Sequence, residues 1–516
     1  MTDLGRKRCW PLALALVLTV LTWSGIASAQ DAATAPAVVE AATEVVAAAA
    51  PATPIDSGST AWMLTSCALV LLMVPGLALF YGGMVRAKNV LNMLLMVMVC
   101  VGVHGILWVA YGYAFAFPVV GSGETRTLIE WGSNAGAGGS IISLLSYDPS
   151  LFFLSSFNEA WARQAFTGDT VGGVENGIPE LAFVMFQGKF FIITPALIVG
   201  ALAERIRFGP FILFSILWST FIYLPVAHWV WNVNGYLFQM GALDFAGGTV
   251  VHILGGVSAL AVCLVLGPRT GYGRTPMPPH SLGLTLIGAG LLWFGWFGFN
   301  AGSAIGIGKD FLPVSGATAA LAFANTQTAA AAAAVVWMLI EWVHGGKPTI
   351  LGFASGMVAG LVVITPCAGH VLPWSSLVIG GLGGAGCYLG CRLKNVFKYD
   401  DSLDAFGVHG IGGAIGAVLV GVFVIRPAGL EVGPQVWIQI KAVLISVIYC
   451  FVGSLVLAQI IKSTIGLRVT TQDEIDGLDI AIHGEAGYNL TEPLGGYVAG
   501  AEGHPDARGS SPTMAR

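Results

Sequence analysis

Long apolar runs separated by short polar stretches dominate the sequence. A helix of about 20 apolar residues crosses the hydrocarbon core of a bilayer, and eleven runs reach or approach that length. They lie near residues 61–82, 92–117, 182–203, 210–231, 248–267, 281–303, 316–343, 350–366, 375–393, 404–425 and 434–463. The pattern predicts an all-α polytopic membrane protein with eleven transmembrane helices.

Lysine and arginine are concentrated in alternate connections between these runs. Twelve lie in one set of connections: Arg86, Lys88, Arg205, Arg207, Arg269, Arg274, Lys347, Arg392, Lys394, Lys398, Lys462 and Arg468. The other set holds four: Arg126, Arg163, Lys309 and Arg426. This asymmetry is typical of the positive-inside rule, so it predicts an external N-terminus and a cytoplasmic C-terminus.

The first residues read as a targeting segment rather than as part of the fold. Arg6-Lys7-Arg8 precedes an apolar stretch from Trp10 to Trp23, and Ala27-Ser28-Ala29 follows. This order is typical of a signal peptide, so we expect residues 1–29 to be cleaved. A retained first transmembrane helix is the alternative. The alanine-rich residues 30–57 are expected to form a disordered leader, and the Gly-, Pro- and Ser-rich residues 491–516 a disordered tail.

Composition supports a membrane protein and excludes several other classes. Hydrophobic residues make up 55% of the 516 positions and charged residues only 10%, whereas soluble domains carry about 25% charged residues. The 70 glycines fit close helix packing in lipid. A net charge of −5 argues against a nucleic-acid partner. Cys387 and Cys391 lie one helical turn apart, but no second pair completes a metal site, and no cofactor is expected.

Two histidines lie within apolar runs and share a local pattern. His252 and His409 each begin an H-x-x-G-G sequence, and by span counting they fall in the fifth and tenth helices. These helices cross in opposite directions, so spans 1–5 and 6–10 are predicted to form an inverted repeat, with an eleventh span outside it. Imidazoles at membrane depth usually mark a transport path. Two separately satisfied core histidines, or a bis-histidine haem site, are the alternatives.

Five stretches carry a family resemblance. They are Phe80-Tyr81-Gly82-Gly83, Gly200-Ala201-Leu202-Ala203-Glu204-Arg205, the run from Gly241 to His252, the run from Gly295 to Ser303, and Asp404-Ala405-Phe406-Gly407-Val408-His409-Gly410. Together they resemble the signature motifs of the Amt/Mep/Rh ammonium transporters, most closely the bacterial Amt branch. The resemblance runs from about Trp62 to Tyr488 and implies a transmembrane transporter domain over residues 58–465.

The resemblance implies a role for each of several residues. His252 and His409 would be hydrogen-bonded twin histidines lining a narrow pore. Ammonium would be recruited at an outer site, and two stacked rings would form a gate beneath it. The implied recruitment residues are Phe186, Trp231 and Ser303, and the implied gate residues are Phe190 and Phe299. Phe186 and Phe190 lie four residues apart and therefore on one helix face.

Two charged residues near these positions have open interpretations. Asp244 precedes the fifth span, where an aspartate commonly caps a helix, and the resemblance implies that it supports the recruitment site. Structural support is favoured over direct contact with ammonium. Lys189 lies between Phe186 and Phe190, in a stretch that is usually uncharged in the family. A cation facing the entrance would repel ammonium, so we expect Lys189 to point elsewhere.

The C-terminal region resembles the family's ordered cytoplasmic segment, which packs under the pores and couples subunits. It covers residues 466–490 and includes Arg468, Gly477, Asp479, His483, Gly484 and Glu485. The resemblance implies a homotrimer, and in bacteria such tails dock with a PII-type signalling protein. The external segment 118–180 has no assigned role, although short amphipathic helices are expected around residues 141–157.

The sequence therefore predicts a transporter or channel for ammonium, methylammonium being its analogue, in the bacterial inner membrane. It is not expected to be an enzyme. The expected mechanism recruits ammonium, removes its proton and conducts ammonia between the histidines, because an ion in an apolar pore is costly. An ammonium sensor that signals to a cytoplasmic partner is the first alternative, and a haem-containing membrane redox protein is the second.

Overall fold

The computed structural model describes residues 56–118, 125–134, 140–157, 178–304, 316–425 and 431–488. All of these residues belong to one compact unit that begins at Thr53. The predicted signal peptide, all but the last residues of the leader, and the predicted tail 491–516 lie outside the described residues.

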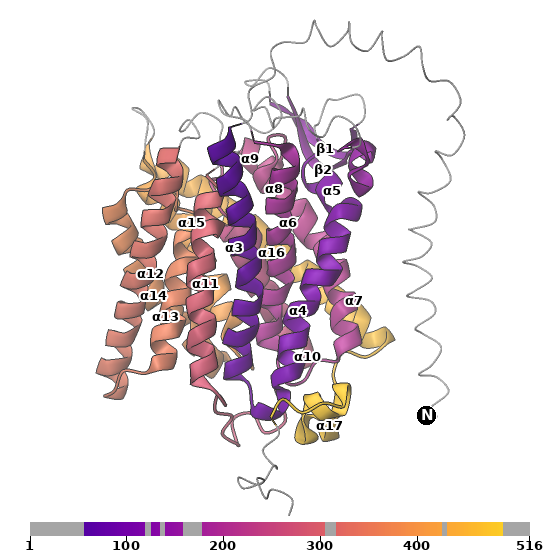
Figure 1. Cartoon of the computed structure of the whole chain (residues 1–516), viewed down its shortest axis with the longest axis vertical. Coiled ribbons are helices and arrows are strands. Elements are labelled where there is room, and N and C mark those ends of the chain that lie inside the picture. Colours follow the sequence, from indigo (N-terminus) through magenta and orange to yellow (C-terminus); the bar gives the residue numbers. More distant parts are fainter. Residues whose placement is uncertain are drawn as a thin grey trace, which may run out of the picture. The chain divides into compact units, whose positions relative to one another are not determined.

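Eleven apolar helical segments run side by side in the described part of the chain (Figure 1). The first five are α3 (Ser57–Met84), Ala87–Ala116, α6 (Glu180–Leu202), Phe208–Trp231 and Gly248–Leu266. The next five are α11 (Leu282–Gly302), α12 (Gly316–Gly345), α13 (Ile350–Ile364), α14 (Pro373–Phe397) and Phe406–Phe423, and α16 (Val432–Thr464) is the last. Ten are long and apolar enough to cross a membrane, and α13 is shorter. The predicted eleven-helix fold is confirmed.

Four of these segments contain a π-helical turn. Ala87–Ala116 comprises a 3₁₀ turn (Ala87–Asn89), α4 (Val90–Leu107), the π turn Trp108–Gly112 and α5 (Tyr113–Ala116). Phe208–Trp231 comprises α7 (Phe208–Trp218), the π turn Ser219–Tyr223 and α8 (Leu224–Trp231). The π turns Gly248–Ile253 and Phe406–Gly410 precede α10 (Leu254–Leu266) and α15 (Ile411–Phe423). Each of the last two turns contains one of the histidines, and π turns are frequent at functional sites.

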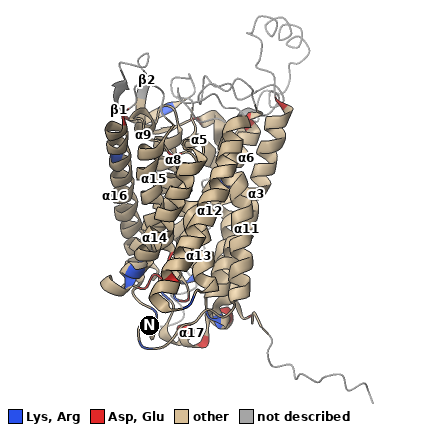
Figure 2. Cartoon of the chain, turned by 90° about the vertical axis from the view of Figure 1, so that its left-hand side faces the viewer, with Lys and Arg blue, Asp and Glu red and all other residues tan. Residues whose placement is uncertain are grey.

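The helix surfaces are those expected of a protein in lipid. Large apolar side chains such as Ile106, Phe294 and Trp437 are exposed on the outside of the helices. Charged residues gather towards the ends of the helices (Figure 2). We refer to the end at which the C-terminal tail lies as the inner end and to the opposite end as the outer end.

A β-hairpin lies at the outer end, where the sequence predicted short helices. Its antiparallel strands are β1 (Arg126–Asn134) and β2 (Ser140–Tyr147), and a 3₁₀ segment, Pro149–Phe157, follows. The expectation of helices was wrong for residues 141–147, where pairing with β1 and docking on the fourth span satisfy the β2 backbone, whereas residues 149–157 are 3₁₀-helical. The Ser143 N–H donates to the Asn234 carbonyl at 2.8 Å, and the Trp229 indole donates to the Leu144 carbonyl at 2.7 Å.

The fifth and tenth spans begin in the same way, as an inverted repeat requires. Asp244 and Asp401 each lie eight residues before their histidine, and both carboxylates accept backbone N–H groups at the start of the helix. The residue five positions before each histidine is left-handed: Gly247 has φ 109° and Asp404 has φ 61°. Aspartate tolerates this conformation better than most residues.

The glycines that follow each histidine let the two spans touch. A Cβ on Gly256 would lie 2.1 Å from the Gly410 nitrogen. A Cβ on Gly413 would lie 2.7 Å from the Gly248 carbonyl oxygen and 3.0 Å from the His252 Cβ. The last glycine of each H-x-x-G-G pattern therefore provides the space in which the other span's histidine region packs, as small residues do at helix crossings in membranes.

Candidate functional site at the histidine pair

The two histidines meet inside the bundle. The Nδ1 atoms of His252 and His409 lie 3.3 Å apart, and the ring planes differ by 14°. Both side chains are buried. In neutral imidazole one ring nitrogen donates and the other accepts, so one Nδ1 donates to the other.

An apolar cavity lies beside the pair. Its volume is about 10 Å³, and its walls include both histidines, Trp296, Phe299 and aliphatic side chains. Trp296 stacks on His252 with centroids 5.3 Å apart, and its indole donates to the Thr365 hydroxyl at 2.9 Å. A cavity of roughly 10–15 Å³ on this scale holds one water-sized molecule. The Nε2 of His252 has no hydrogen-bond partner among the described residues and is free to meet such a guest.

Aromatic rings connect the pair to the outer end. Phe190 and Phe299 have centroids 4.5 Å apart with planes tilted by 55°, so they pack closely but obliquely. Phe190 also contacts Phe186 at 5.0 Å and Trp231 at 5.5 Å. Phe299 lies 6.0 Å from His252. All four aromatic side chains are buried, so the predicted recruitment and gate residues form one continuous cluster above the histidines.

The remaining recruitment residue, Ser303, lies at the C-cap of α11. Its hydroxyl donates to the Phe299 carbonyl at 2.8 Å, which leaves the hydroxyl oxygen able to accept a bond from a guest. Ser303 is almost fully buried. The structure thus brings Ser303 to the same helix end as the gate residue Phe299.

Asp244 is fully engaged by the backbone of the fifth span. Its Oδ1 accepts from Gly247 at 3.0 Å and from Gly248 at 2.6 Å. Its Oδ2 accepts from Thr249 at 2.9 Å and from Val250 at 3.2 Å. The Trp231 indole donates to the Asp244 main-chain carbonyl at 3.1 Å. This carboxylate satisfies the four free N–H groups of a helix start and fixes Trp231, which is a supporting geometry rather than a ligating one.

Lys189 does not face the pore cavities. It is half-buried on α6 and lines neither the cavity beside the histidines nor the one described below. The adjacent Gly188 packs on Trp108, where a Cβ would lie 2.6 Å from the indole.

A second cavity lies on the inner side of His409. Its volume is about 40 Å³, and its walls include Phe80, Tyr81, Ser355, Asp404 and His409. Asp404 Oδ1 lies 2.6 Å from the Lys394 ammonium nitrogen. Burial raises the pKa of the neighbouring Asp401, and the Asp404 charge adds to that rise, while Lys394 and two backbone N–H groups oppose it.

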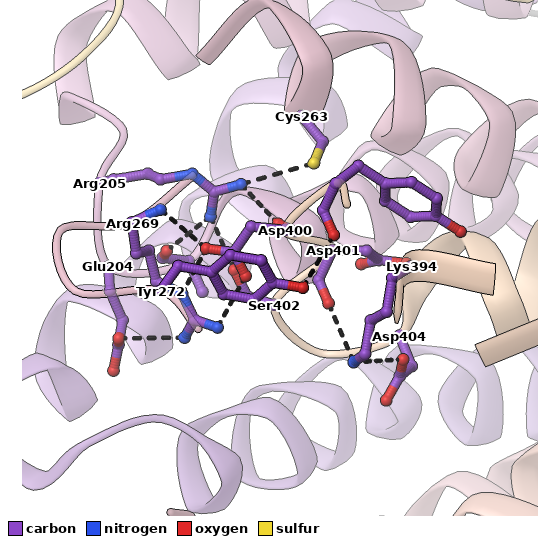
Figure 3. Close-up of polar contacts among 12 residues, drawn as sticks. Glu204, Arg205, Cys263, Arg269, Tyr272, Lys394, Asp400, Asp401, Ser402 and Asp404 are labelled. Atoms are coloured by element: carbon purple, nitrogen blue, oxygen red, sulfur yellow. Dashed lines mark hydrogen bonds and ion pairs between the residues drawn. The ribbon is translucent and has the colours of Figure 1, made fainter. Parts of the chain in front are cut away.

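A buried ionic network lies beside this cavity (Figure 3). Arg269 bonds Asp400 at 2.8 Å and Glu204 at 3.1 Å, and Arg86 bonds Glu204 at 2.7 Å. Arg205 is wholly buried and donates to the carbonyl of Asp400 and, through other nitrogens, to neighbouring groups. Burial would raise the pKa of Glu204, but the hydrogen bonds and charges of Arg86 and Arg269 outweigh it and hold that pKa below its ordinary value.

The C-terminal tail is attached to the inner end of the bundle by α17 (Thr471–Asp476) and the π turn Asp479–His483. Four of the residues predicted for the tail are among those that make contacts there. Arg468 donates to Glu474 at 2.7 Å, and Gly477, with φ 105°, lies against Lys88. Asp479 accepts from the Asn92 N–H at 2.8 Å, and His483 Nε2 lies 3.0 Å from Asn92 Oδ1. Gly484 ends the turn with φ 71°, and Glu485 is exposed.

Sequence reasoning left the inner cavity and its acidic residues unassigned. Asp401, Asp400 and Arg269 were not singled out, and Asp404 was noted only as part of a motif. The sequence did contain a signal for Asp401, because Asp401 precedes His409 by the same number of residues as Asp244 precedes His252. The pairing of Arg269 with Asp400 joins residues 131 positions apart and has no local signal. Among the described residues, no group of three His, Cys, Asp or Glu side chains could hold a metal ion.

The fold and site define a multi-pass helical membrane protein with a buried, hydrogen-bonded histidine pair inside its helix bundle. Residues 61–488 match the family model described as Ammonium Transporter Family. The chain belongs to this family.

Relatives and solved structures agree with that assignment. The chain is 43% identical over 443 residues to an ammonium transporter of Bacillus subtilis (strain 168), covering 84% of this chain and 99% of the relative. It is 42% identical over 440 residues to ammonium transporter Amt1 of Archaeoglobus fulgidus, covering 84% and 100%. The crystal structure of Saccharomyces cerevisiae Mep2 matches with a TM-score of 0.67 and 31% identity, covering 83% of this chain and 93% of Mep2.

Proposed function

We propose that this protein conducts ammonium nitrogen across the membrane as ammonia, through a pore lined by His252 and His409. The observation that carries the proposal is the hydrogen-bonded histidine pair beside an apolar cavity the size of a single small molecule. Membership of the ammonium transporter family supplies the substrate.

The path begins at the outer aromatic cluster. Ammonium is recruited by the faces of Phe186 and Trp231, which contribute about 0.5–2 kcal/mol to cation binding, and by the Ser303 hydroxyl. Asp244 holds this site through the backbone and Trp231. The ion loses a proton at the gate formed by Phe190 and Phe299, because an unpaired charge is too costly in the apolar segment beyond.

The neutral guest then passes the histidine pair. The unpaired Nε2 of His252 offers a hydrogen-bonding group to ammonia inside an otherwise apolar wall. Potassium has the same charge as ammonium but no proton to release, so it cannot enter the apolar segment in neutral form. The path therefore selects ammonium over potassium by chemistry rather than by size.

Uptake measurements test this pore. We expect His252→Ala and His409→Ala to reduce methylammonium uptake by a transport-deficient cell at least about tenfold, a loss of about 1.4 kcal/mol of barrier lowering. His344→Ala is a matched control, because His344 contacts Tyr388 and lines neither cavity. Parental flux and selectivity in both pore variants would refute the assignment.

The fate of the released proton requires a separate measurement. In the electrogenic version of the mechanism, the proton follows ammonia along the shared histidine hydrogen bond. Purified protein in planar bilayers should then carry an ammonium-dependent current that both histidine variants abolish. Ammonia flux without current at any pH would limit the mechanism to neutral transport.

Assembly, regulation and location complete the proposal. We place the protein in a bacterial inner membrane with a cytoplasmic C-terminus, because lysine and arginine gather at the inner connections. We propose a homotrimer with a pore in each subunit, and a tail that docks a PII-type protein. Light scattering in detergent would test the trimer, and co-purification with a PII protein would test the docking.

Sensing is a second candidate function. A solved structure described as "Sensor Amt Protein" matches with a TM-score of 0.68 and 27% identity, covering 82% of this chain and 98% of that chain. A transport-deficient cell distinguishes the two roles. Ammonium-dependent signalling without accumulation of methylammonium would favour the sensor.

A further inference from the structure

The inner cavity is lined by the spans that the inverted repeat pairs with those of the outer recruitment site. The outer site takes Phe186 from the third span, Ser303 from the sixth and Asp244 from the start of the fifth. The repeat pairs spans 1 with 6, 3 with 8 and 5 with 10. The inner cavity is lined accordingly by the first, eighth and tenth spans.

The inner cavity also carries the chemistry of a cation site. Phe80 and Tyr81 supply aromatic rings from α3, and Ser355 supplies a hydroxyl from α13. Asp404 supplies a carboxylate. Rings, hydroxyls and carboxylates are the groups that bind a small ammonium ion in proteins. With about 40 Å³ of volume, the cavity has room for more than one water-sized molecule.

Asp404 marks the difference between the two repeats. It occupies the left-handed position that glycine occupies at Gly247 in the outer repeat. The outer carboxylate, Asp244, has both oxygens engaged by backbone N–H groups. In the inner repeat Asp401 performs that capping task for Ala405 and Phe406, so Asp404 is an additional carboxylate that lines the cavity.

Lys394 forms an ion pair with this carboxylate. Its ammonium nitrogen lies 2.6 Å from Asp404 Oδ1 and 3.3 Å from the main-chain carbonyl of Asp401. Asp404 is partly exposed, so a cation from the inner side can reach it. A lysine ammonium is chemically a substituted ammonium ion, so a free ammonium ion at this carboxylate would compete with Lys394.

We propose that the inner cavity is a second ammonium-binding site, with Asp404 as its anionic ligand and Phe80, Tyr81 and Ser355 as its walls. This second site rests on the proposed function and extends it to the inner end of the pore. Ammonium arriving from or leaving to the inner side occupies this site before or after ammonia passes the histidines, in competition with Lys394. The outer and inner faces of the pore therefore have separate affinities for ammonium.

Transport measured from each face tests this site. The parent and its variants are reconstituted in vesicles of defined orientation, and the half-saturating concentration of ammonium is measured with ammonium on the inner side and then on the outer side. Asp404→Asn removes the charge and keeps a residue that tolerates the left-handed backbone. We expect it to raise the inner-side half-saturation about threefold to tenfold and to leave the outer-side value unchanged.

Two further variants complete the design. Lys394→Gln removes the competing ammonium group and should lower the inner-side half-saturation, and Ser303→Ala should raise only the outer-side value. Lys347→Gln, on an exposed connection, is the control. Inner-side values that stay within twofold of the parent in both Asp404→Asn and Lys394→Gln would overturn the site. A parent protein that conducts no ammonium from either face would instead refute the proposed function.

Discussion

His252 and His409 approach each other through like atoms, Nδ1 to Nδ1 at 3.3 Å, although 157 residues separate them. One shared proton therefore fixes both rings, and the loss of either ring removes the same hydrogen bond. When two residues share one interaction, the free-energy effects of replacing them do not add in the double variant.

This sharing predicts the outcome of a double-mutant cycle on transport rate. His252→Ala combined with His409→Ala should reduce flux by little more than either single substitution, so the coupling should exceed about 0.5 kcal/mol. Ser303→Ala combined with His409→Ala serves as the comparison, because Ser303 bonds Phe299 rather than a histidine. Multiplicative losses in the histidine pair would show that the two rings act independently.

Asp244→Ala should destabilise the protein. The substitution leaves four backbone N–H groups without their acceptor in a buried region, so we expect a loss of at least about 2 kcal/mol. Asp244→Asn keeps one acceptor oxygen and should be intermediate. Thermal melting in detergent measures both, and Asp56→Ala, at the exposed start of α3, is the control cap.

Transport kinetics distinguish a supporting role of Asp244 from direct contact between Asp244 and ammonium. If Asp244 acts through the backbone, Asp244→Asn should lower the maximal rate and keep the half-saturating concentration near that of the parent. A large rise in half-saturation at an unchanged maximal rate would instead make Asp244 a ligand of ammonium.

The sequence predicts the spans well because each is a long apolar run and most of the connections between the runs carry charge. It also predicts that His252 and His409 meet, because matching patterns on helices of opposite sense define a repeat. The hairpin of β1 and β2 was missed since its register depends on docking to Asn234 and Trp229, far away in sequence. Short apolar stretches such as 141–145 do not distinguish strand from helix by periodicity alone.

The inner cavity was missed for a different reason. Its residues come from three spans, and the motifs that contain Phe80, Asp404 and His409 do not show that these residues line one cavity. Only the pairing of Asp404 with Gly247 across the repeat makes the extra carboxylate visible. Counting back five residues from each histidine aligns Asp404 with Gly247 in the sequence, but only the structure shows that Asp404 lines a cavity.

Replacing the buried carboxylate of Asp479 should release the C-terminal tail from the inner end of the bundle. Asp479 accepts the N–H groups of Leu91 at 3.1 Å and Asn92 at 2.8 Å, so it caps the start of α4 from a distant segment. Asp479→Ala removes a cap of about 1 kcal/mol or more, which should speed tryptic cleavage after Arg468 about fivefold. Asp476→Ala is the matched control, because Asp476 is exposed and bonds only Gln472 in the described part of the chain. Equal cleavage rates in the two variants would show that the cap does not hold the tail.

Stability should fall in acid because of the ionic network at the inner end. The pKa of Glu204 is lowered in the folded protein, where Arg86 and Arg269 outweigh burial, and the pKa of Asp400 is lowered in the same way by Arg269 and Arg205. A carboxyl with a lowered folded-state pKa stabilises the protein above its ordinary pKa of about 4. That contribution is lost as the pH falls through the ordinary value towards the folded-state value.

Thermal melting between pH 7 and pH 3 measures this loss. The parent should melt at progressively lower temperature below about pH 5, where these carboxyls begin to take up protons in the unfolded state. Glu204→Gln breaks a buried pair and should cost about 3–5 kcal/mol at pH 7, with a shallower acid slope because one titrating group is gone. Glu485→Gln, on an exposed position of the tail, should keep the parental slope. An acid slope in Glu204→Gln as steep as that of the parent would remove Glu204 from the groups that set acid stability.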